Sequence, residues 1–346
     1  MNSQDRQVLI EVENLKKYFP LTKGFLRTHI GDVKAVDDVS FCIHKGEALG
    51  LVGESGCGKT TTGRLLVRAL EPTDGKIYFH KDGKRIDVVQ LSRRGEELLE
   101  YRRQAQLVFQ DPYTSLNPRL TVMRIIEEPL LCLTEMPEGE RREWIRELLR
   151  IVGLDPRYAN RYPHAFSGGQ RQRIGVARAL ALNPALIVAD EAVSALDVSI
   201  QAQIINLMED LQKEYGLAYL FITHDLSVVH HISRRVAVMY VGKFVELAEK
   251  QEVFFKPRHP YTEALLSSLP QPDPNIKLQR IIMKGDVADP ANRPSGCCFH
   301  PRCLYAREIC SKEEPPLIDI ADHGEPEHLC ACHLAEELNL SGVAEA

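Results

Sequence analysis

The most constraining feature of this sequence is the segment 53–60, which reads Gly-Glu-Ser-Gly-Cys-Gly-Lys-Thr and fits the pattern G-x-x-x-x-G-K-[ST]. It follows an apolar run at residues 48–52 and precedes a helical pattern at residues 59–70. Glycines let backbone N–H groups converge on phosphate oxygens, and the first turn of a helix adds a field that favours anions. A chance glycine-rich turn is the alternative, but the strand–loop–helix order favours a nucleotide-phosphate site in an α/β sheet.

The side chains of this phosphate loop (residues 53–60) supply further chemistry. Lys59 is placed to neutralise the β- and γ-phosphates of a nucleoside triphosphate, and the Thr60 hydroxyl is placed to bind Mg²⁺. The other residues predicted to contact the nucleotide here are Gly53, Ser55, Gly56, Gly58 and Thr61.

Short apolar runs that alternate with helical patterns predict a doubly wound α/β core up to about residue 250. Residues 8–12 and 35–42 are rich in β-branched side chains and predict strands. Residues 185–189 and 218–222 are almost wholly apolar, which is typical of strands buried in a parallel sheet. A charged, helix-rich stretch at 113–154 predicts an inserted helical subdomain.

Two acidic residues follow the apolar run at 185–189. Asp190 would be costly at the end of a buried strand unless it were paired or held a cation, so we expect it to hold Mg²⁺ through water. Glu191 comes directly after it and is predicted to polarise the attacking water. The alternative is a strand end that turns into solvent and carries ordinary surface acids.

A Ser-Gly-Gly-Gln turn at residues 167–170 indicates a second anion site, because it opens a helical pattern. The candidate nucleotide contacts in it are Ser167, Gly168, Gly169 and Gln170. A plain N-capped helix is the alternative. One compact ATPase has little use for two anion sites unless two copies share nucleotides.

The order of these motifs resembles that of the nucleotide-binding domains of ABC transporters. The further residues that match are Gln110, Ser194-Ala-Leu-Asp197 and His224. The resemblance implies an α/β fold over residues 8–252, with a P-loop NTPase core of the ABC ATPase type, an antiparallel β subdomain and an inserted helical subdomain at about 113–175. It also implies a head-to-tail dimer, in which ATP lies between the phosphate loop of one subunit and the Ser-Gly-Gly-Gln turn of the other.

The same resemblance implies roles for four residues. Gln110 would contact Mg²⁺ or the attacking water and sense the membrane subunits. His224 would touch the γ-phosphate, although a lone histidine at a strand end is more often a satisfied structural residue. Asp197 would shape the dimer interface. Phe19 matches the aromatic that stacks on adenine; a core aromatic is the alternative, and the adjacent Tyr18 leaves the register open by one residue.

Six of the nine cysteines fall within residues 297–332. Disulfides are disfavoured in a reducing compartment, so a local cluster of thiols favours a metal site. The spacing fits neither the paired C-x2-C pattern of common zinc folds nor the bacterial ferredoxin run. Zinc, an iron–sulfur cluster and free thiols therefore all remain open, and the further candidate zinc ligands are His300, His323, His328 and His333.

The tail resembles that of the oligopeptide/dipeptide-import ATPases. The matching pieces include His-Pro-Tyr-Thr at 259–262 and Phe-His-Pro-Arg-Cys at 299–303. Ahead of zinc or no metal, the resemblance implies a [4Fe–4S] cluster on Cys297, Cys303, Cys310 and Cys332. We expect a structural role for it, because a metal would hold together a small, cysteine-rich C-terminal extension (residues 253–346).

Composition and charge limit the cellular setting. The net charge of −5 over 346 residues provides no basic field for nucleic acid, and no apolar run is long enough to cross a bilayer. The polar start has no apolar segment of a secretory signal. We therefore expect a peripheral protein at the cytoplasmic face of the cell membrane, with no nucleic-acid partner.

The partners implied by the resemblance are a second ABC ATPase subunit (a paralogue or a second copy), two transmembrane permease subunits and an extracellular or periplasmic solute-binding protein. The implied reaction is hydrolysis of ATP that powers import of di- or oligopeptides, with nickel complexes or oligosaccharides as alternative solutes. Two other classes stay open: a soluble ABC ATPase acting on nucleic acid or ribosomes, and an iron–sulfur redox protein.

Overall fold

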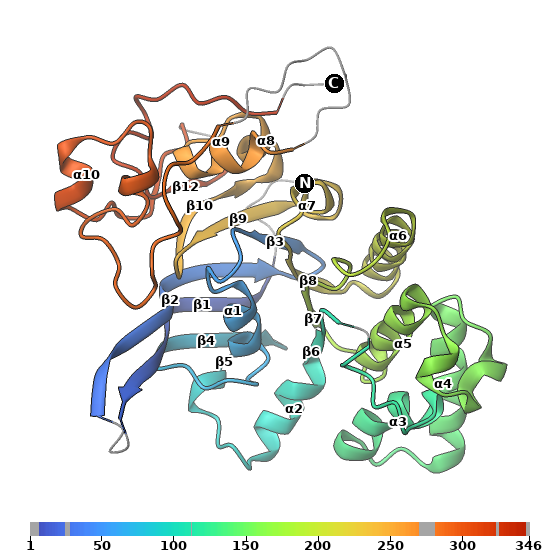
Figure 1. Cartoon of the computed structure of the whole chain (residues 1–346). Helices are drawn as coiled ribbons and strands as arrows, with labels where there is room; N and C mark the ends of the chain where they lie inside the picture. The colour runs from blue at the N-terminus through green and yellow to red at the C-terminus, as the bar shows by residue number, and fades with distance from the viewer. Residues whose placement is uncertain (1–6, 25–27, 112, 270–280, 323–324, 344–346) are drawn as a thin grey trace.

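The structure is a computed structural model that describes residues 7–24, 28–111, 113–269, 281–322 and 325–343. Within these residues the strands form two sheets, and helices flank them or gather in a layer to one side (Figure 1). The larger sheet has eight strands in the order β11-β12-β10-β9-β3-β8-β7-β6, and the smaller sheet has four in the order β2-β1-β4-β5.

The centre of the larger sheet is parallel. Strands β6, β7, β8, β3 and β9 pair in parallel, whereas β9, β10, β12 and β11 pair antiparallel. Every residue of β3, β7 and β8 is buried, as expected for strands covered on both faces. The strands are β3 (Ala48–Val52), β6 (Ala105–Val108), β7 (Leu186–Asp190), β8 (Ala218–Ile222), β9 (Arg235–Tyr240), β10 (Lys243–Glu249), β11 (Ile318–Asp319) and β12 (His328–Cys330).

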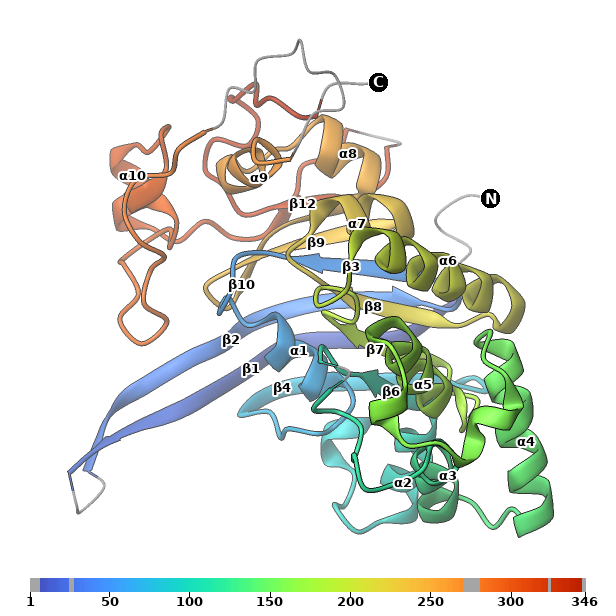
Figure 2. The ribbon, with the colours of Figure 1, turned by 45° about the vertical axis from the view of Figure 1, so that its right-hand side comes forward.

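The smaller sheet is antiparallel, and helix α1 (Lys59–Leu66) packs with it against the larger sheet. The apolar cluster between them includes Ile43 of β2, Leu65 of α1 and Leu220 of β8. Strands β1 and β2 continue as a long ribbon that projects from the body of the molecule (Figure 2). The strands are β1 (Val8–Lys23), β2 (Thr28–His44), β4 (Asp74–Lys81) and β5 (Lys84–Asp87).

The opposite face of the larger sheet carries a helical layer. Successive side chains of a strand point to opposite faces, so Tyr219 and Phe221 of β8 pack into this layer while Leu220 packs toward α1. Helices α3, α4 and α5 gather at one side of the molecule (Figure 1). The helices before residue 240 other than α1 are α2 (Glu96–Gln104), α3 (Val122–Leu133), α4 (Glu138–Ile151), α5 (Gly168–Leu180), α6 (Val198–Tyr215) and α7 (Leu226–Ile232), and the 3-10 turns are η2 (Val88–Gln90), η3 (Pro156–Asn160) and η4 (Pro163–Ala165).

The described part of the C-terminal extension is built onto the larger sheet. Strand β12 pairs antiparallel with β10, and β11 pairs with β12. An apolar cluster that includes Val236, Phe254 and Phe299 joins this part of the chain to β9. Its helical elements are α8 (Lys250–Phe255), α9 (Pro260–Leu266), η5 (His300–Arg302) and α10 (Glu308–Lys312).

A buried carboxylate ties the extension to β10. Glu246 is fully buried, and its carboxylate accepts hydrogen bonds from the backbone N–H groups of Arg258 (2.7 Å) and His259 (3.1 Å). His328 Nε2 of β12 lies 2.7 Å from the same carboxylate and is also buried. Satisfying a buried carboxylate in this way avoids the large cost of leaving it without partners.

The expected strands at 48–52 and 218–222 match β3 and β8. Strand β1 extends from 8 to 23, well past the expected end at residue 12, because β2 pairs with it along the projecting ribbon. Helix α1 ends at Leu66 rather than at residue 70, because Arg68 adopts a positive φ of 53° that cannot continue a helix. None of the described helices is both long and apolar enough to cross a membrane.

Replacing His328 with alanine should destabilise the attachment of the extension. The change leaves the Glu246 carboxylate without its side-chain partner inside the protein, and we expect a loss of about 3 kcal/mol in the free energy of unfolding. Denaturant unfolding measures the loss, and limited proteolysis reports whether residues beyond 300 are cut first.

Lys312→Ala is the matched control, because it breaks an exposed ion pair with Glu308 and should cost under about 1 kcal/mol. Equal stability of His328→Ala and the control would contradict the assignment of Glu246 and His328 as the attachment point.

Candidate functional site

The phosphate loop connects the end of β3 to the start of α1, as the sequence predicts. Its glycines at 53, 56 and 58 have φ values of 151°, 80° and 111°, which side-chain-bearing residues rarely adopt. A Cβ atom on Gly53 would lie 2.1 Å from the Met239 carbonyl oxygen, and one on Gly58 would lie 2.1 Å from the Ala35 carbonyl oxygen. The loop is therefore held by close backbone contact with both β9 and β2.

Lys59 is buried and folded back into the loop. Its Nζ donates to the carbonyl oxygens of Gly53 (2.7 Å) and Glu54 (2.9 Å). Thr60 Oγ1 donates to Asp190 Oδ1 at 2.8 Å, so the two predicted Mg²⁺-associated residues face each other across α1 and β7. Burial raises the pKa of Asp190, and the hydrogen bond from Thr60 opposes that rise. A cation at this point would favour the charged carboxylate.

Two of the predicted catalytic residues, Gln110 and His224, contact the carboxylate of the third, Glu191. Glu191, which has a positive φ of 47°, points its side chain between two loops. Its Oε2 accepts a hydrogen bond from Gln110 Nε2 at 2.8 Å, and its Oε1 lies 3.4 Å from His224 Nδ1. These residues follow β7, β6 and β8, which are neighbours in the sheet, so parallel strands bring their carboxyl ends together.

The Ser-Gly-Gly-Gln turn is a helix start, as predicted. Ser167 caps α5, with its Oγ accepting from the Gln170 N–H (3.4 Å) while Gln170 Oε1 accepts from the Ser167 N–H (3.1 Å). A Cβ on Gly169 would lie 2.4 Å from Ile200, so glycine is required for the packing of α5 on α6. In the part of the chain that the structure describes, no hydrogen bond joins this turn to the phosphate loop.

The two aromatic candidates on β1 differ in their environment. The Tyr18 hydroxyl is hydrogen-bonded to Asp37, and its ring lies under the Lys34 ammonium. Phe19 is 37% exposed and has Lys17 Nζ 5.1 Å from its ring centroid. Phe19 is thus the more exposed of the two rings, and exposure is what stacking on adenine requires.

The four predicted cluster cysteines line one small cavity of about 20 Å³, together with His259, His300 and His333. This volume holds about one water molecule. Burial raises the pKa of the Cys297 thiol to about 12 and that of the Cys332 thiol to about 11, and neighbouring cysteines add to both shifts. Cys298 lies outside the lining of this cavity, Cys330 is buried on β12, and His323 lies outside the described residues.

Among the described residues, no three or more His, Cys, Asp or Glu side chains are arranged to hold a metal ion. The donor set is soft and suits zinc or an iron–sulfur cluster, but the present side-chain positions are not those of a bound metal. A single ion needs less rearrangement of this cavity than a four-iron core does. His328 is also removed from the candidate ligands, since it is engaged by Glu246.

Two residues of the extension reach the phosphate loop and were not predicted to do so. The Tyr261 hydroxyl accepts a hydrogen bond from the Glu54 N–H at 2.8 Å, and Arg302 forms two bonds to the Glu54 carboxylate, at 2.7 and 3.1 Å. They are 207 and 248 residues from Glu54 in the sequence, so no local pattern could reveal the contacts. The only signal was their place inside the two tail segments at 259–262 and 299–303.

Comparison with known proteins shows which family has this sequence and fold. The sequence model of the ABC transporter family matches residues 36–194, and a model described as the oligopeptide/dipeptide transporter C-terminal region matches residues 245–310. The chain is 54% identical to the oligopeptide transport ATP-binding protein AppF of Bacillus subtilis, over 96% of this chain and 99% of that protein. It is 49% identical to the dipeptide transport ATP-binding protein DppF of Haemophilus influenzae, over 89% and 92% respectively.

This chain belongs to the ABC transporter family. It carries the C-terminal region of the oligopeptide/dipeptide branch, and it is an ATPase subunit coupled to transport.

Solved ABC cassettes share its fold. A dimeric ATP-binding cassette in a post-hydrolysis state, bound to ADP and Pi, is 31% identical, with a TM-score of 0.60 over 70% of this chain and 98% of that chain. A cassette of the cbiONQ ABC transporter complex of Clostridium perfringens is 27% identical, with a TM-score of 0.58 over 71% and 90%. The predicted ABC ATPase core is therefore confirmed as a P-loop fold with mixed α/β sheets, and these matches do not extend to a separate cysteine-rich unit.

Proposed function

We propose that this ABC transporter subunit hydrolyses ATP to power the import of di- or oligopeptides through partner membrane subunits. The observation that carries the catalytic part is the meeting of Gln110 and His224 at the Glu191 carboxylate. The similarity to oligopeptide and dipeptide transport ATP-binding proteins, which includes the C-terminal region, supports the choice of solute. Nickel complexes and oligosaccharides are the alternative solutes.

Each residue of the site has a specific part in the reaction. Backbone N–H groups of the phosphate loop and the Lys59 ammonium bind the phosphates, and Phe19 stacks on adenine. Glu191 accepts a proton from the attacking water, while Gln110 and His224 orient that carboxylate and the water. The nucleotide contacts proposed from the loop and from α1 are Gly53, Ser55, Gly56, Gly58, Thr60 and Thr61.

The pair of Thr60 and Asp190, with Gln110, fits Mg²⁺, because these residues offer oxygen ligands and no cationic side chain among the described residues is bonded to the buried Asp190 carboxylate. Mg²⁺ neutralises charge on the phosphates when it is bound.

A second ATPase subunit, either a paralogue or another copy, completes each site in this proposal. Ser167 is exposed, Gly168 is partly exposed, and neither bonds to the phosphate loop of its own chain. Asp197 and Val198 at the start of α6 are likewise exposed, with Val198 at 83%. These surfaces support a head-to-tail arrangement in which Ser167, Gly168, Gly169 and Gln170 contact the partner's nucleotide.

The segment around Gln110 is the proposed contact with two permease subunits. Phe109 and Tyr113 flank it and are exposed by 42% and 60%. The Arg171 guanidinium lies 4.1 Å from the centroid of the Tyr113 ring, which links this surface to α5. Contact there would place the chain at the cytoplasmic face of the membrane as a peripheral subunit, with solute delivered by an extracellular or periplasmic binding protein.

The finer proposal for the tail is a [4Fe–4S] cluster on Cys297, Cys303, Cys310 and Cys332, with zinc as the alternative. The four thiols line one cavity, which supports a metal bound by thiolates. The cavity is too small for a four-iron cluster as it stands, so the cysteine side chains would have to move outward to make room for one. Its role would be to brace the fold of the extension.

Glu191→Gln should lower kcat for ATP hydrolysis by at least about 100-fold while ATP still binds, because glutamine cannot accept the proton from water. Hydrolysis is measured with the assembled transporter, and trapping of ATP-bound dimers is followed by size-exclusion chromatography. Glu143→Gln on the exposed face of α4 is the control and should behave as wild type. Steady-state hydrolysis that Glu191→Gln leaves unchanged would rule out this role.

Copurification from membranes and solute-dependent hydrolysis test the transport assignment. We expect the full chain to copurify with two permease subunits, and peptide-loaded binding protein to stimulate hydrolysis in reconstituted vesicles. Lys59→Ala should assemble equally but neither hydrolyse ATP nor import labelled peptide. Stimulation by a nickel complex or an oligosaccharide instead of peptide would change the solute, and association with ribosomes or nucleic acid alone would contradict transport.

Analysis of iron, acid-labile sulfide and zinc in anaerobically purified protein tests the metal. We expect about four irons and four sulfides per chain, with Cys310→Ser losing them. Cys132→Ser is the control, since Cys132 is an exposed thiol on α3 far from the extension in sequence. Stoichiometric zinc without sulfide would replace the cluster by a zinc site, and the absence of both metals would remove the proposal.

A further inference from the structure

Glu54 is the point where the C-terminal extension and the phosphate loop meet. Two of its three polar groups are bonded to the extension: its N–H donates to Tyr261 Oη (2.8 Å), and its carboxylate receives the fork of Arg302 (2.7 and 3.1 Å). The third, its carbonyl oxygen, accepts from Lys59 Nζ at 2.9 Å. One residue therefore stands between the extension and the lysine that binds phosphate.

The two contacts come from a packed and buried base. The rings of Tyr240, Tyr261 and Phe299 contact one another with centroids 4.7–5.3 Å apart. Tyr261 is fully buried and Arg302 is 8% exposed. A bidentate guanidinium–carboxylate pair fixes direction as well as distance, and it is stronger where water is excluded. The extension consequently fixes the orientation of the Glu54 side chain as well as its position.

A second contact fixes the other side of the loop. Arg293 donates to the Asp37 carboxylate and, at 2.6 Å, to the Lys34 carbonyl oxygen on β2. The neighbouring Ala35 carbonyl is the group against which Gly58 packs.

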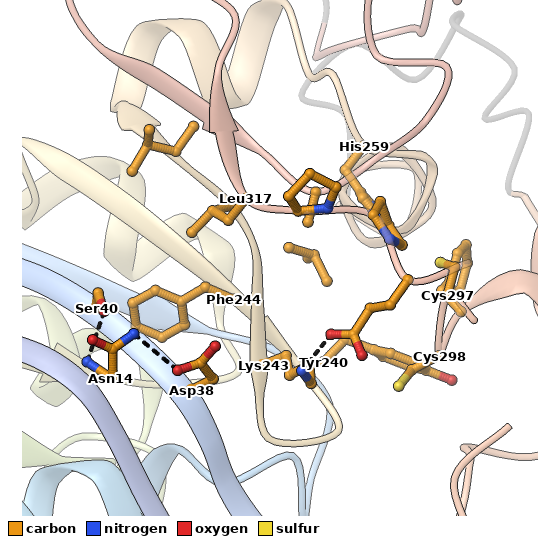
Figure 3. Close-up of a pocket in the computed structure, with 17 residues that line it drawn as sticks. Asn14, Asp38, Ser40, Tyr240, Lys243, Phe244, His259, Cys297, Cys298 and Leu317 are labelled. Carbon is orange, nitrogen blue, oxygen red and sulfur yellow. Dashed lines mark hydrogen bonds and ion pairs between the residues drawn. The ribbon is translucent and has the colours of Figure 1, made fainter. Parts of the chain in front are cut away.

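A pocket of about 360 Å³ separates part of the extension from β1 and β2. Asn14, Asp38 and Ser40 line one side of it, opposite His259, Cys297 and Cys298 (Figure 3). Neither Arg293 nor Arg302 lines this pocket, so both arginine contacts lie outside it.

We propose that Tyr261 and Arg302 are positioning residues for ATP. They hold Glu54, and through it the phosphate loop and Lys59, in the shape that receives the phosphates. The proposal rests on the proposed nucleotide site of this chain. A loop that is already ordered loses less conformational freedom when the ligand binds, so the extension raises ATP affinity without touching ATP.

Arg302→Gln tests this directly, because it removes the charged fork and keeps a polar, though shorter, side chain. Binding of a fluorescent ATP analogue to the full-length chain should weaken about five- to tenfold, and KM for ATP in the assembled transporter should rise by the same factor with kcat within about twofold. Arg302→Lys, which keeps the charge and loses the fork, should fall between Arg302→Gln and wild type. Tyr261→Phe, which removes one hydroxyl, should weaken binding about three- to tenfold.

Two matched controls lie in the same extension. Arg307 makes an exposed ion pair with Glu337 at 2.7 Å, and the Tyr305 hydroxyl bonds to Glu263 at 3.0 Å. Arg307→Gln and Tyr305→Phe should leave ATP affinity unchanged. In the double variant, Glu54→Gln should add little to Arg302→Gln, since each change removes the same ion pair.

These measurements distinguish a positioning role of Arg302 and Tyr261 from a purely structural one. Lower thermal stability with ATP affinity and KM at control values would overturn the proposal and leave a purely structural contact. Loss of metal together with affinity in Arg302→Gln, while Tyr261→Phe keeps both, would also overturn it. If Arg302→Gln does not fold, Tyr261→Phe decides the question. ATP binding that survives Lys59→Ala would instead refute the proposed nucleotide site itself.

Discussion

The close approach of two backbone carbonyls to the phosphate loop is the constraint on which the rest of the structure depends. The carbonyl of Met239 on β9 and that of Ala35 on β2 occupy the space that side chains at Gly53 and Gly58 would need. The Gly242 N–H adds a third contact by donating to the Cys57 carbonyl at 2.8 Å. The loop is thus shaped by both sheets at once, and whatever fixes β9 and its neighbour β10 also fixes the loop.

Elements whose conformation depends on a few adjacent residues could be predicted from the sequence. Strand β3, the phosphate loop and the Ser167 cap of α5 each follow from a few adjacent residues. The hydrogen bond of Gln110 to Glu191 spans 81 residues and was not predicted; the family resemblance implied only that Gln110 would contact Mg²⁺ or the attacking water. The strands β11 and β12 were not anticipated, because segments of two and three residues have no periodicity and acquire their form from pairing with β10. The contacts of Arg302 and Tyr261 with Glu54 were missed because they join residues 248 and 207 positions apart in the sequence.

Exposure divides the functional residues into two groups. Lys59 and Asp190 are buried, and Glu191 is only partly exposed, so the groups proposed to bind phosphate or Mg²⁺ or to move a proton sit where water is limited and electrostatic interactions are strong. Ser167 and Asp197 are exposed, which agrees with the proposed assembly, in which their partners belong to another subunit. The helical layer of α3–α5 and the extension lie toward opposite edges of the larger sheet, near β6 and near β11 and β12 respectively (Figure 1). In the proposed assembly the helical layer can therefore meet a membrane partner without displacing the extension from the phosphate loop.

The pairing of β12 with β10 also limits strand pairing between different molecules. Without it, β10 would present a row of open N–H and C=O groups along a strand that also carries Phe244, Val245, Leu247 and Ala248, and such an edge is a template for pairing with another chain. The strands that cover β10 are so short that they offer almost no template of their own. A chain cut back before β12 would therefore leave this edge of the sheet open, so the tail covers the edge whether or not it ever holds a metal.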